Sequence, residues 1–475
     1  MSMEEFGYTI RVRGSKLVSC DIDEDYDSII DGPIYIDIPE GITEICQDAF
    51  RNIDEWFVLT LPNSLEIIDD FAFYNCSGLG EENSNFLPYN LKQIGAHAFE
   101  FCRLTQVALP NSLETIGDFA FANNDIEKII IPASVKHIGD GVFSSPESIL
   151  FDNYTHVGGI YLAEGNQNYA IKNDCLVELD TGIIKACTNT SKNFITLPKI
   201  VSIDGYKTCT FVEEIAPFAF SGNKNIKAID ICLEKIGYGA FAGCENLNII
   251  IENEVCEIEE GAFVGVKSLR VSDDNPEFKI KDGYLIDVMA ASLLYAPKNA
   301  DRIVFIPEDV ERIGDRAFFG CEQVECVDFA FSRVSEIGVR AFSHCKNLDT
   351  VEFNDWLTCI EDFSFSDCER LSYVSLPNSI ENLGNGAFRN CNEISSVNIP
   401  RVLYVGERVF GVDWIYRETL NKTTGRMEPV SPKRINIFCE NYDDSGWDAN
   451  WKSAPNDITV YWATEFEYNE DGIPY

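Results

Sequence analysis

The sequence repeats a short unit centred on a phenylalanine, and this repeat restricts the fold more than any other feature. The phenylalanine closes an Ala-Phe or similar dipeptide, and thirteen of the 32 phenylalanines stand in this register. Neighbouring marker phenylalanines lie 21 to 26 residues apart, except across two gaps of 77 and 55 residues. Such a period predicts a solenoid of similar turns. The markers are Phe50, Phe73, Phe99, Phe121, Phe143, Phe220, Phe241, Phe263, Phe318, Phe342, Phe365, Phe388 and Phe410.

Each unit shows the same order of residue types around its phenylalanine. Residues 109–132 and 376–400 both contain Pro-x-Ser, then an apolar residue and glycine, then Ala-Phe, and both close on alternating apolar residues before a proline. The alternation predicts a short strand with every second side chain buried, which the proline ends because it lacks an amide hydrogen. The apolar-Gly step predicts a turn. The stretch around Ala-Phe predicts one short helical turn.

A unit with a single apolar face cannot bury that face alone. Stacking the units at the spacing of β-strands, about 4.8 Å, joins their apolar faces into one core. We expect the marker phenylalanines to form an inner column, each contributing roughly 1.5–3 kcal/mol of burial. The chain has 475 residues, whereas a single compact core stops growing at about 250–300 residues. A core that grows along one axis accommodates this length.

The repeat resembles that of the BspA-type leucine-rich repeat family, whose signature is Ala-Phe-x-x-Cys. The resemblance covers residues 38–410. It implies an α/β repeat solenoid of predominantly short β-strands, with turns and short helical segments. Residues 1–37 and 411–475 are then expected to cap the two ends. The resemblance also implies an interaction protein, often at the cell surface, and it implies no catalytic residues.

Two long segments interrupt the array, at about 147–210 and 267–305. Each alternates apolar residues around residues that favour tight turns, which predicts a β-hairpin insertion. The shorter polar insertion at 80–86 predicts a surface loop. The turn residues are Asn173-Asp174 and Thr181-Gly182 in the first long segment and Lys281-Asp282-Gly283 in the second.

Charge and hydropathy exclude two classes of function. The 37 basic and 78 acidic residues leave a net charge of −41, which repels nucleic acid. No stretch approaches the about 18 apolar residues of a membrane span, and the start holds no apolar run of signal-peptide length. The 17 cysteines, an odd number, suit a reducing compartment. These features favour a cytoplasmic protein, whereas the family resemblance implies secretion or the cell surface, so the location stays open.

The sequence holds no recognisable catalytic or cofactor-binding motif. The four histidines show no paired metal-binding spacing, and P-loop, nucleophile-elbow and dinucleotide-binding motifs are missing. We therefore expect a non-enzymatic protein without a cofactor. The alternative is hydrolytic activity within 144–219 or 411–475, where His156 is the only histidine.

Seven cysteines stand three residues after a marker phenylalanine, so they should stack from turn to turn. Strand spacing falls within the range that a disulfide bridges, which permits cross-turn disulfides or a ladder of soft-metal ligands. The second interpretation is a small buried side chain that fills the turn, because other units hold Asn124, Asn223 or Val266 there. We favour the second interpretation. The cysteines are Cys76, Cys102, Cys244, Cys321, Cys345, Cys368 and Cys391.

Two further clusters each allow a structural and a binding interpretation. Residues 21–27 open like a calcium-binding loop, but Tyr26 occupies the glycine position and Gly32 the position of the bidentate glutamate, which favours a solvated acidic loop. Trp447, Trp451 and Trp462 lie near acidic residues and could form a carbohydrate-binding platform. Tryptophans in a terminal cap more often cover the last turn.

The outward-facing positions of the predicted strands are the candidate binding surface. They hold few charges and several apolar residues, and a charge-poor stripe on such an acidic chain suggests a protein interface. The competing interpretation is that β-propensity alone selects these residues. We expect a protein partner, with a host or cell-surface component as one candidate, and leave the oligomeric state open. The candidate residues are Lys128, Ile130, Ile249, Thr350, Glu352, Tyr373, Ser375, Ser396 and Asn398.

Overall fold

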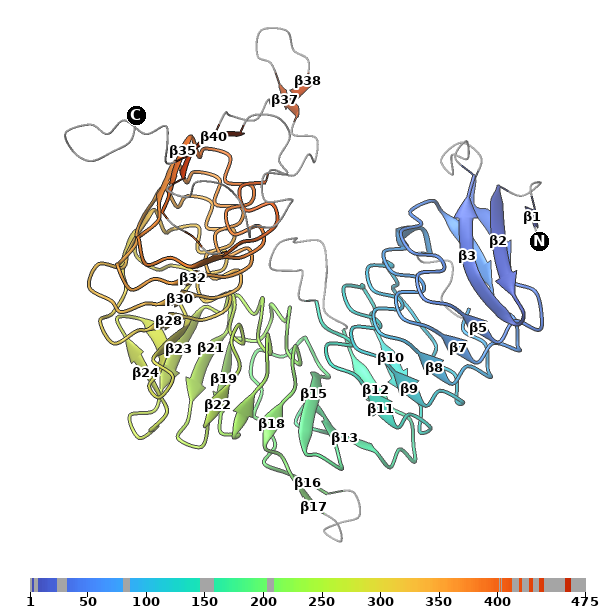
Figure 1. Cartoon of the computed structure of the whole chain (residues 1–475). Helices are drawn as coiled ribbons and strands as arrows, with labels where there is room; N and C mark the ends of the chain where they lie inside the picture. The colour runs from blue at the N-terminus through green and yellow to red at the C-terminus, as the bar shows by residue number, and fades with distance from the viewer. Residues whose placement is uncertain are drawn as a thin grey trace, which may run out of the picture. The chain divides into compact units, whose positions relative to one another are not determined.

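The computed structural model describes most of the chain and divides it into two compact units, Met1–Asp274 and Asn275–Tyr475. Figure 1 shows the course of the chain. The described residues are 2–3, 7–23, 32–79, 86–145, 158–202, 209–400, 402, 404–411, 418–420, 427–429, 435–439 and 458–462.

Most turns contribute a strand of three or four residues to one face of the solenoid. Within a sheet these longer strands pair parallel and in register, as Cys326 with Thr350 and Asp328 with Glu352. The first unit holds β4 (Ile34–Asp37), β6 (Phe57–Thr60), β10 (Ile129–Ile131), β12 (Ile160–Leu162), β19 (Ala228–Ile231), β21 (Asn248–Ile251) and β23 (Ser268–Val271). The second holds β27 (Ile303–Phe305), β29 (Cys326–Asp328), β31 (Thr350–Glu352), β33 (Tyr373–Ser375), β35 (Ser396–Ile399), β39 (Ile435–Cys439) and β40 (Ile458–Trp462).

A second row consists of parallel strands of two residues, and each of these strands ends at the apolar residue of the apolar-Gly step. The predicted turn therefore begins at the residue after this apolar residue, one residue later than the sequence indicates. In the first unit these strands are β5 (Glu44–Ile45), β7 (Ile67–Ile68), β8 (Gln93–Ile94), β9 (Thr115–Ile116), β11 (His137–Ile138), β18 (Glu214–Ile215), β20 (Lys235–Ile236) and β22 (Glu257–Ile258). In the second they are β28 (Arg312–Ile313), β30 (Glu336–Ile337), β32 (Cys359–Ile360), β34 (Asn382–Leu383) and β36 (Tyr404–Val405).

Three antiparallel arrangements precede strands of this second row. The last strand of each arrangement pairs parallel with the first two-residue strand that follows it. They are β2 (Tyr8–Arg13) and β3 (Lys16–Ile22) before β5; β13 (Tyr169–Lys172), β14 (Cys175–Glu178) and β15 (Ile183–Cys187) before β18; and β24 (Phe278–Lys281), β25 (Tyr284–Asp287) and β26 (Ser292–Tyr295) before β28. Their tight turns include Asn173, Asp174 and Asp282, all with positive φ. β1 (Ser2–Met3) extends the first arrangement by pairing antiparallel with β2. Separate antiparallel pairs join β16 (Ile200–Ser202) to β17 (Cys209–Phe211) and β37 (Glu418–Leu420) to β38 (Met427–Pro429).

The predicted helical turn around Ala-Phe does not form, so the fold is a β-solenoid and the α/β assignment was wrong. Among the described residues the only helix is the 3-10 helix η1 (Ser77–Leu79). Around Phe73 the amides alternate between two kinds of partner. Phe73 donates to the Ala98 carbonyl of the next turn (2.9 Å), whereas Tyr74 donates back to Phe71 within its own turn (3.0 Å). A helix forms all its main-chain bonds within itself; here every second bond joins two turns instead.

Along with this alternation, the residues two positions before and two positions after most marker phenylalanines have the left-handed backbone conformation, with positive φ. Around Phe73 these residues are Phe71 (φ 55°) and Asn75 (φ 56°), and around Phe241 they are Gly239 (φ 61°) and Gly243 (φ 77°). Glycine and asparagine adopt this conformation at the lowest steric cost, which explains why they recur there.

The glycine of the apolar-Gly step has a different role. At Gly338 a Cβ would lie 2.4 Å from Oδ1 and 2.9 Å from the amide nitrogen of Asp315 in the preceding turn. This glycine therefore allows two turns to approach closely. Five turns carry a side chain at the corresponding position, so the requirement is local: Cys46, Asp69, Ala216, Glu259 and Glu361.

The predicted inner column of phenylalanines is confirmed. All thirteen markers are at most 2% exposed. In the second unit the rings stack with centroids 4.7 Å apart for Phe318 and Phe342, and 5.1 Å apart for Phe342 and Phe365. Offset stacking at this separation adds to the free energy of burial.

The stacked cysteines are buried free thiols, as the favoured interpretation predicted. They also carry a hydrogen bond that the sequence analysis missed. The Sγ of Cys345 donates to the Phe318 carbonyl of the preceding turn (3.1 Å), and that of Cys368 to the Phe342 carbonyl (3.2 Å). In another turn Asn124 Nδ2 donates to the Phe99 carbonyl (2.7 Å). The exchange of cysteine with asparagine was the available signal, because both side chains can donate.

Candidate binding surface

The outward side of the longer strands, which we call the strand face, carries most of the predicted site residues. In the first unit Lys128 and Ile130 are exposed, with 48% of Ile130 accessible. In the second unit Thr350, Glu352, Tyr373 and Ser375 are exposed, and Ser396 and Asn398 are half-buried. Each strand turns its other residues into the core.

Ile249 is not on this face, and its assignment was wrong. It is 1% exposed and packs in the core, whereas its neighbours Asn248 and Ile250 face outward. Pairing with the preceding strand sets this register, since Ile249 lies opposite the buried Ile229. In this turn only one residue separates the buried Leu247 from the first buried strand residue, whereas other turns have two residues there, as between Leu371 and Val374. Three consecutive isoleucines cannot reveal such a shift, because either alternation looks apolar.

The strand face of the second unit is more apolar than the sequence analysis recognised. Ile303 and Phe305 are 54% and 58% exposed on β27. They lie opposite Cys326 and Asp328 of β29. They were missed because they fall within the predicted insertion at 267–305. The alternation that ends at Pro307 was the available signal.

The strand face of the first unit pairs an aromatic residue with a cation. Tyr161 of β12 is 51% exposed and lies opposite Ile130 of β10. The Nζ of Lys128 stands 4.8 Å from the centre of the Tyr161 ring, a cation–π contact. Tyr35 of β4 is a further exposed aromatic residue, 65% accessible.

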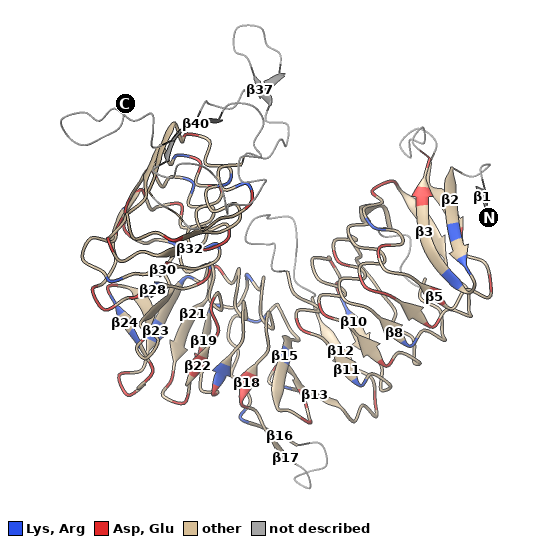
Figure 2. Ribbon diagram, in the orientation of Figure 1, with Lys and Arg blue, Asp and Glu red and all other residues tan. Residues whose placement is uncertain are grey.

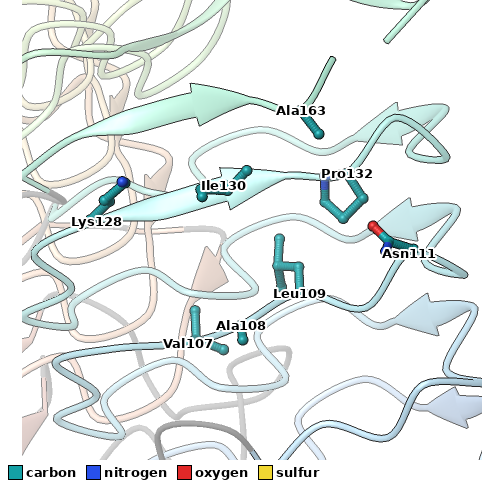
Figure 3. A pocket seen from close by; sticks show the side chains of 8 residues that line it. All are labelled: Val107, Ala108, Leu109, Asn111, Lys128, Ile130, Pro132 and Ala163. Atoms are coloured by element: carbon teal, nitrogen blue, oxygen red, sulfur yellow. The ribbon is translucent and has the colours of Figure 1, made fainter. Parts of the chain in front are cut away.

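A pocket of about 340 Å³ opens on this face beside β10 (Figure 3). One wall is the segment 107–109, and the other is formed by Ile130 of β10 and by Lys128, which directly precedes this strand. The lining is mainly apolar and consists of Val107, Ala108, Leu109, Asn111, Lys128, Ile130, Pro132 and Ala163.

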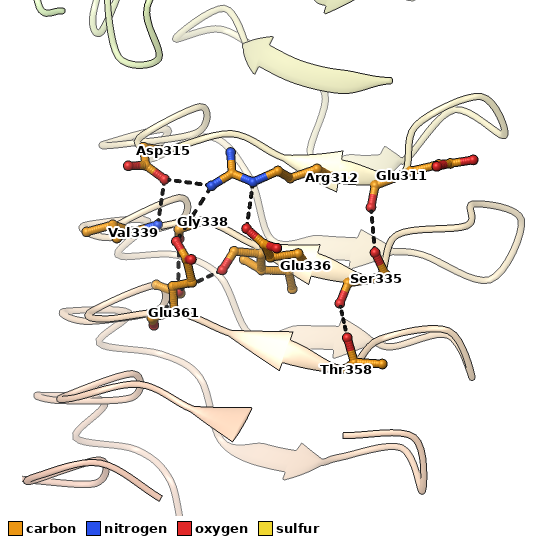
Figure 4. Close-up of polar contacts among 11 residues, drawn as sticks. Glu311, Arg312, Asp315, Ser335, Glu336, Gly338, Val339, Thr358 and Glu361 are labelled. Carbon is orange, nitrogen blue, oxygen red and sulfur yellow. Dashed lines mark hydrogen bonds and ion pairs between the residues drawn. The ribbon is translucent and has the colours of Figure 1, made fainter. Parts of the chain in front are cut away.

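Ion pairs gather instead on the row of two-residue strands. Arg312 Nε lies 2.7 Å from Glu336 of the next turn, and Arg312 Nη2 contacts both Asp315 (3.2 Å) and Glu361 (3.6 Å; Figure 4). Lys235 bridges Glu257 (3.2 Å) in the same way. Each of the two-residue strands β18, β20 and β22 carries a charged residue (Figure 2). Among the longer strands of the same unit, β6, β10, β12 and β21 carry none, and β4, β19 and β23 carry one each. Partly exposed pairs of this kind contribute at most about 1 kcal/mol each.

Two described histidines, His97 and His344, pack against neighbouring turns, whereas His137 is exposed. His97 stacks between Phe71 and Phe119, with ring centres 4.6 and 5.0 Å apart, and its Nδ1 lies 2.5 Å from the Glu100 carboxylate. Burial lowers the pKa of His344, which lies 3.8 Å from Asp367. In the described part of the chain no three His, Cys, Asp or Glu side chains are grouped as metal ligands.

Four predicted features lie outside the described residues. Most of the acidic loop at 21–27 and of the polar insertion at 80–86 belongs to this group, as do His156 and the pair Trp447 and Trp451. The backbone of Trp462 ends β40, but its side chain is not described.

The parallel stacked turns, the buried phenylalanine column and the open strand face define a repeat solenoid. The model of the BspA-type leucine-rich repeat region matches six copies, over residues 34–150, 184–279 and 295–412. The chain belongs to this family.

Among solved structures, the chain is similar at low identity to several leucine-rich repeat proteins. The pneumococcal vaccine antigen PcpA is 15% identical, with 96% of each chain covered and a TM-score of 0.38. A leucine-rich cell surface protein from Faecalibacterium prausnitzii is 20% identical, over 84% of this chain and 89% of that one, with a TM-score of 0.38. A leucine-rich repeat protein from Eubacterium ventriosum is 21% identical, over 82% and 94% respectively, with a TM-score of 0.42.

No curated protein matches the chain significantly. Within the described residues, no helix has the length and apolar character needed to span a membrane.

Proposed function

We propose that the protein is a non-enzymatic scaffold that binds a protein partner through its strand face. The observation that carries this proposal is the exposure of large apolar and aromatic side chains on that face in both units. Ile130 and Tyr161 represent the first unit, and Phe305 and Tyr373 the second. Tyrosine and other aromatic residues dominate the binding energy of many interfaces, because they bury a large area at low entropic cost.

The distribution of charge supports the same surface. Ion pairs between turns occupy the row of two-residue strands, as around Arg312, whereas the strand face has fewer charges to desolvate. Burying unpaired charge weakens association, so the strand face is the less costly surface to cover. The net charge of −41 opposes a nucleic-acid partner. Membership of a repeat family also supports a binding role, since repeat folds present extended surfaces.

Two tyrosines of the second unit provide a matched test. Tyr373 lies on the strand face and Tyr404 on the row of two-residue strands, and they are 47% and 43% exposed. We expect Tyr373→Glu to reduce partner capture at least tenfold, because it places a charge in the covered surface. Tyr404→Glu should leave capture unchanged. The measurement is quantitative mass spectrometry of proteins retained from bacterial and host extracts by each immobilised variant.

Thermal unfolding of both tyrosine variants provides the control, and we expect melting temperatures close to that of the wild type. Equal capture by Tyr373→Glu and the wild type would contradict the assignment of the strand face. The same series includes Thr350→Arg and Lys128→Glu, each of which tests one further exposed position.

A further inference from the structure

The strand face of the first unit is interrupted beside β10. Residues 106–109 precede 128–131 by one repeat of 22 residues and have the same apolar alternation. They form no strand, however, and their main-chain groups make no hydrogen bond to another described residue. The turns are joined on both sides of this interruption. Glu127 donates to the Thr105 carbonyl (3.0 Å), and Ser134 Oγ donates to the Leu113 carbonyl (2.7 Å).

The interruption creates the pocket, and its lining limits what can enter. Leu109 is only half-buried, whereas Ile131, its counterpart one turn later, is fully buried. Leu109, Ile130 and Pro132 form much of the pocket surface. A volume of about 340 Å³ accepts one aromatic or long aliphatic side chain. Such a side chain gains free energy by leaving water.

Two polar features remain available around the pocket. The amides and carbonyls of 106–109, which pair with no other described residue, can pair with an extended main chain, as an unpaired strand does in β-augmentation. Within the described residues Lys128 contacts no carboxylate, and its only charged or aromatic contact there is the Tyr161 ring. Other lysines of the same unit do pair with acids, such as Lys136 with Glu114 (2.6 Å). With no carboxylate partner among the described residues, the Lys128 ammonium can bind an anion at the pocket edge.

We infer that this pocket binds an extended segment of a protein partner, in which a large apolar side chain enters the cavity and a neighbouring carboxylate meets Lys128. The inference rests on the proposed function, since it assigns one anchoring contact to the strand face. The Lys128 ammonium favours a segment with a carboxylate, and the apolar cavity favours a large apolar residue next to that carboxylate.

Fluorescence anisotropy with short labelled peptides tests the inference directly on the full chain. The probes are three N-acetylated hexapeptides, Gly-Ser-Phe-Glu-Ser-Gly and its counterparts with Phe-Lys or Ala-Glu at the centre. We expect the Phe-Glu peptide to bind at least tenfold more tightly than either counterpart. Lys128→Glu should reverse the preference between Phe-Glu and Phe-Lys, because the edge then attracts a cation.

A pair of alanine variants separates blocking of the pocket from damage to the fold. Ala108 lines the pocket and is exposed, so Ala108→Trp fills it without entering the core. We expect this variant to lose at least tenfold in affinity for the Phe-Glu peptide. Ala228→Trp makes the same change at an outward position of β19 and should bind as the wild type does. Unaltered melting of both variants verifies the fold.

The inference is overturned if the three peptides bind equally, if none binds at millimolar concentration, or if Ala108→Trp binds as tightly as the wild type. These failures differ from failure of the proposed function. If partner capture still depends on Tyr373 while the peptides fail, the strand face stands as the binding surface and the pocket alone is wrong.

Discussion

Phe342→Ala is expected to lower the free energy of unfolding of the second unit by about 3–5 kcal/mol. The Phe342 side chain is fully buried, and its ring stacks against Phe318 (4.7 Å) and Phe365 (5.1 Å). Alanine leaves a cavity between two turns that are held together from both sides, so little of it can close. Because each turn contacts only its neighbours, the loss of stability concentrates in the turn of Phe342 and the two turns beside it. Urea unfolding measures the total loss of unfolding free energy, and hydrogen exchange shows which turns lose stability.

Phe363→Ala is the matched control for this cavity. Phe363 lies two residues before the next marker, is half-buried, and contacts the Arg340 and Arg389 guanidinium groups at 5.5 and 5.8 Å. Its loss removes surface contacts and leaves no enclosed cavity, so we expect a cost of roughly 1 kcal/mol. Equal destabilisation by the two variants would contradict the role of the inner column.

Raising the pH from 9 to 10 is expected to destabilise the fold through its buried thiols. Burial raises the pKa of Cys76 to about 12 and that of Cys321 to about 12, against 9.0 for a solvated thiol. Above pH 9 the unfolded chain loses these protons while the folded chain keeps them, so the unfolded state binds fewer protons and stability falls. Each such thiol contributes on the order of 1 kcal/mol per pH unit. Stability from this source is complete below pH 9.

Urea unfolding at pH 7, 9 and 10 measures this slope, and single alanine variants apportion it. Cys76→Ala should reduce the decrease between pH 9 and 10 by the contribution of one thiol. Cys256 is exposed, so Cys256→Ala should leave the decrease unchanged. If Cys76→Ala leaves the decrease in stability between pH 9 and 10 unchanged, the buried Cys76 thiol is not a source of that decrease. Cys209 is exposed as well, so both Cys209 and Cys256 should react with alkylating reagents in the folded protein.

The family, the inner column and most outward positions could be predicted from sequence because each depends on spacing within one repeat. Phe342 is buried for the same reason as every other marker, and Tyr373 faces outward because its strand alternates clearly. Ile249 was misplaced because three isoleucines in succession conceal the alternation, and only pairing with β19 sets the register. Ile303 and Phe305 were overlooked because a long gap in the period concealed an ordinary strand.

By itself, the sequence determined the period of the solenoid and the side chains that fill its core, because burial follows from repeated apolar residues. Only the tertiary structure decided how one turn bonds to the next. Amides around Phe73 donate to the following turn, so no helix forms, and the Cys345 thiol donates to the preceding one. The opening beside β10 arises in the same way, because residues 106–109 have the composition of a strand. Whether they pair depends on the distance between turns, which no local pattern encodes.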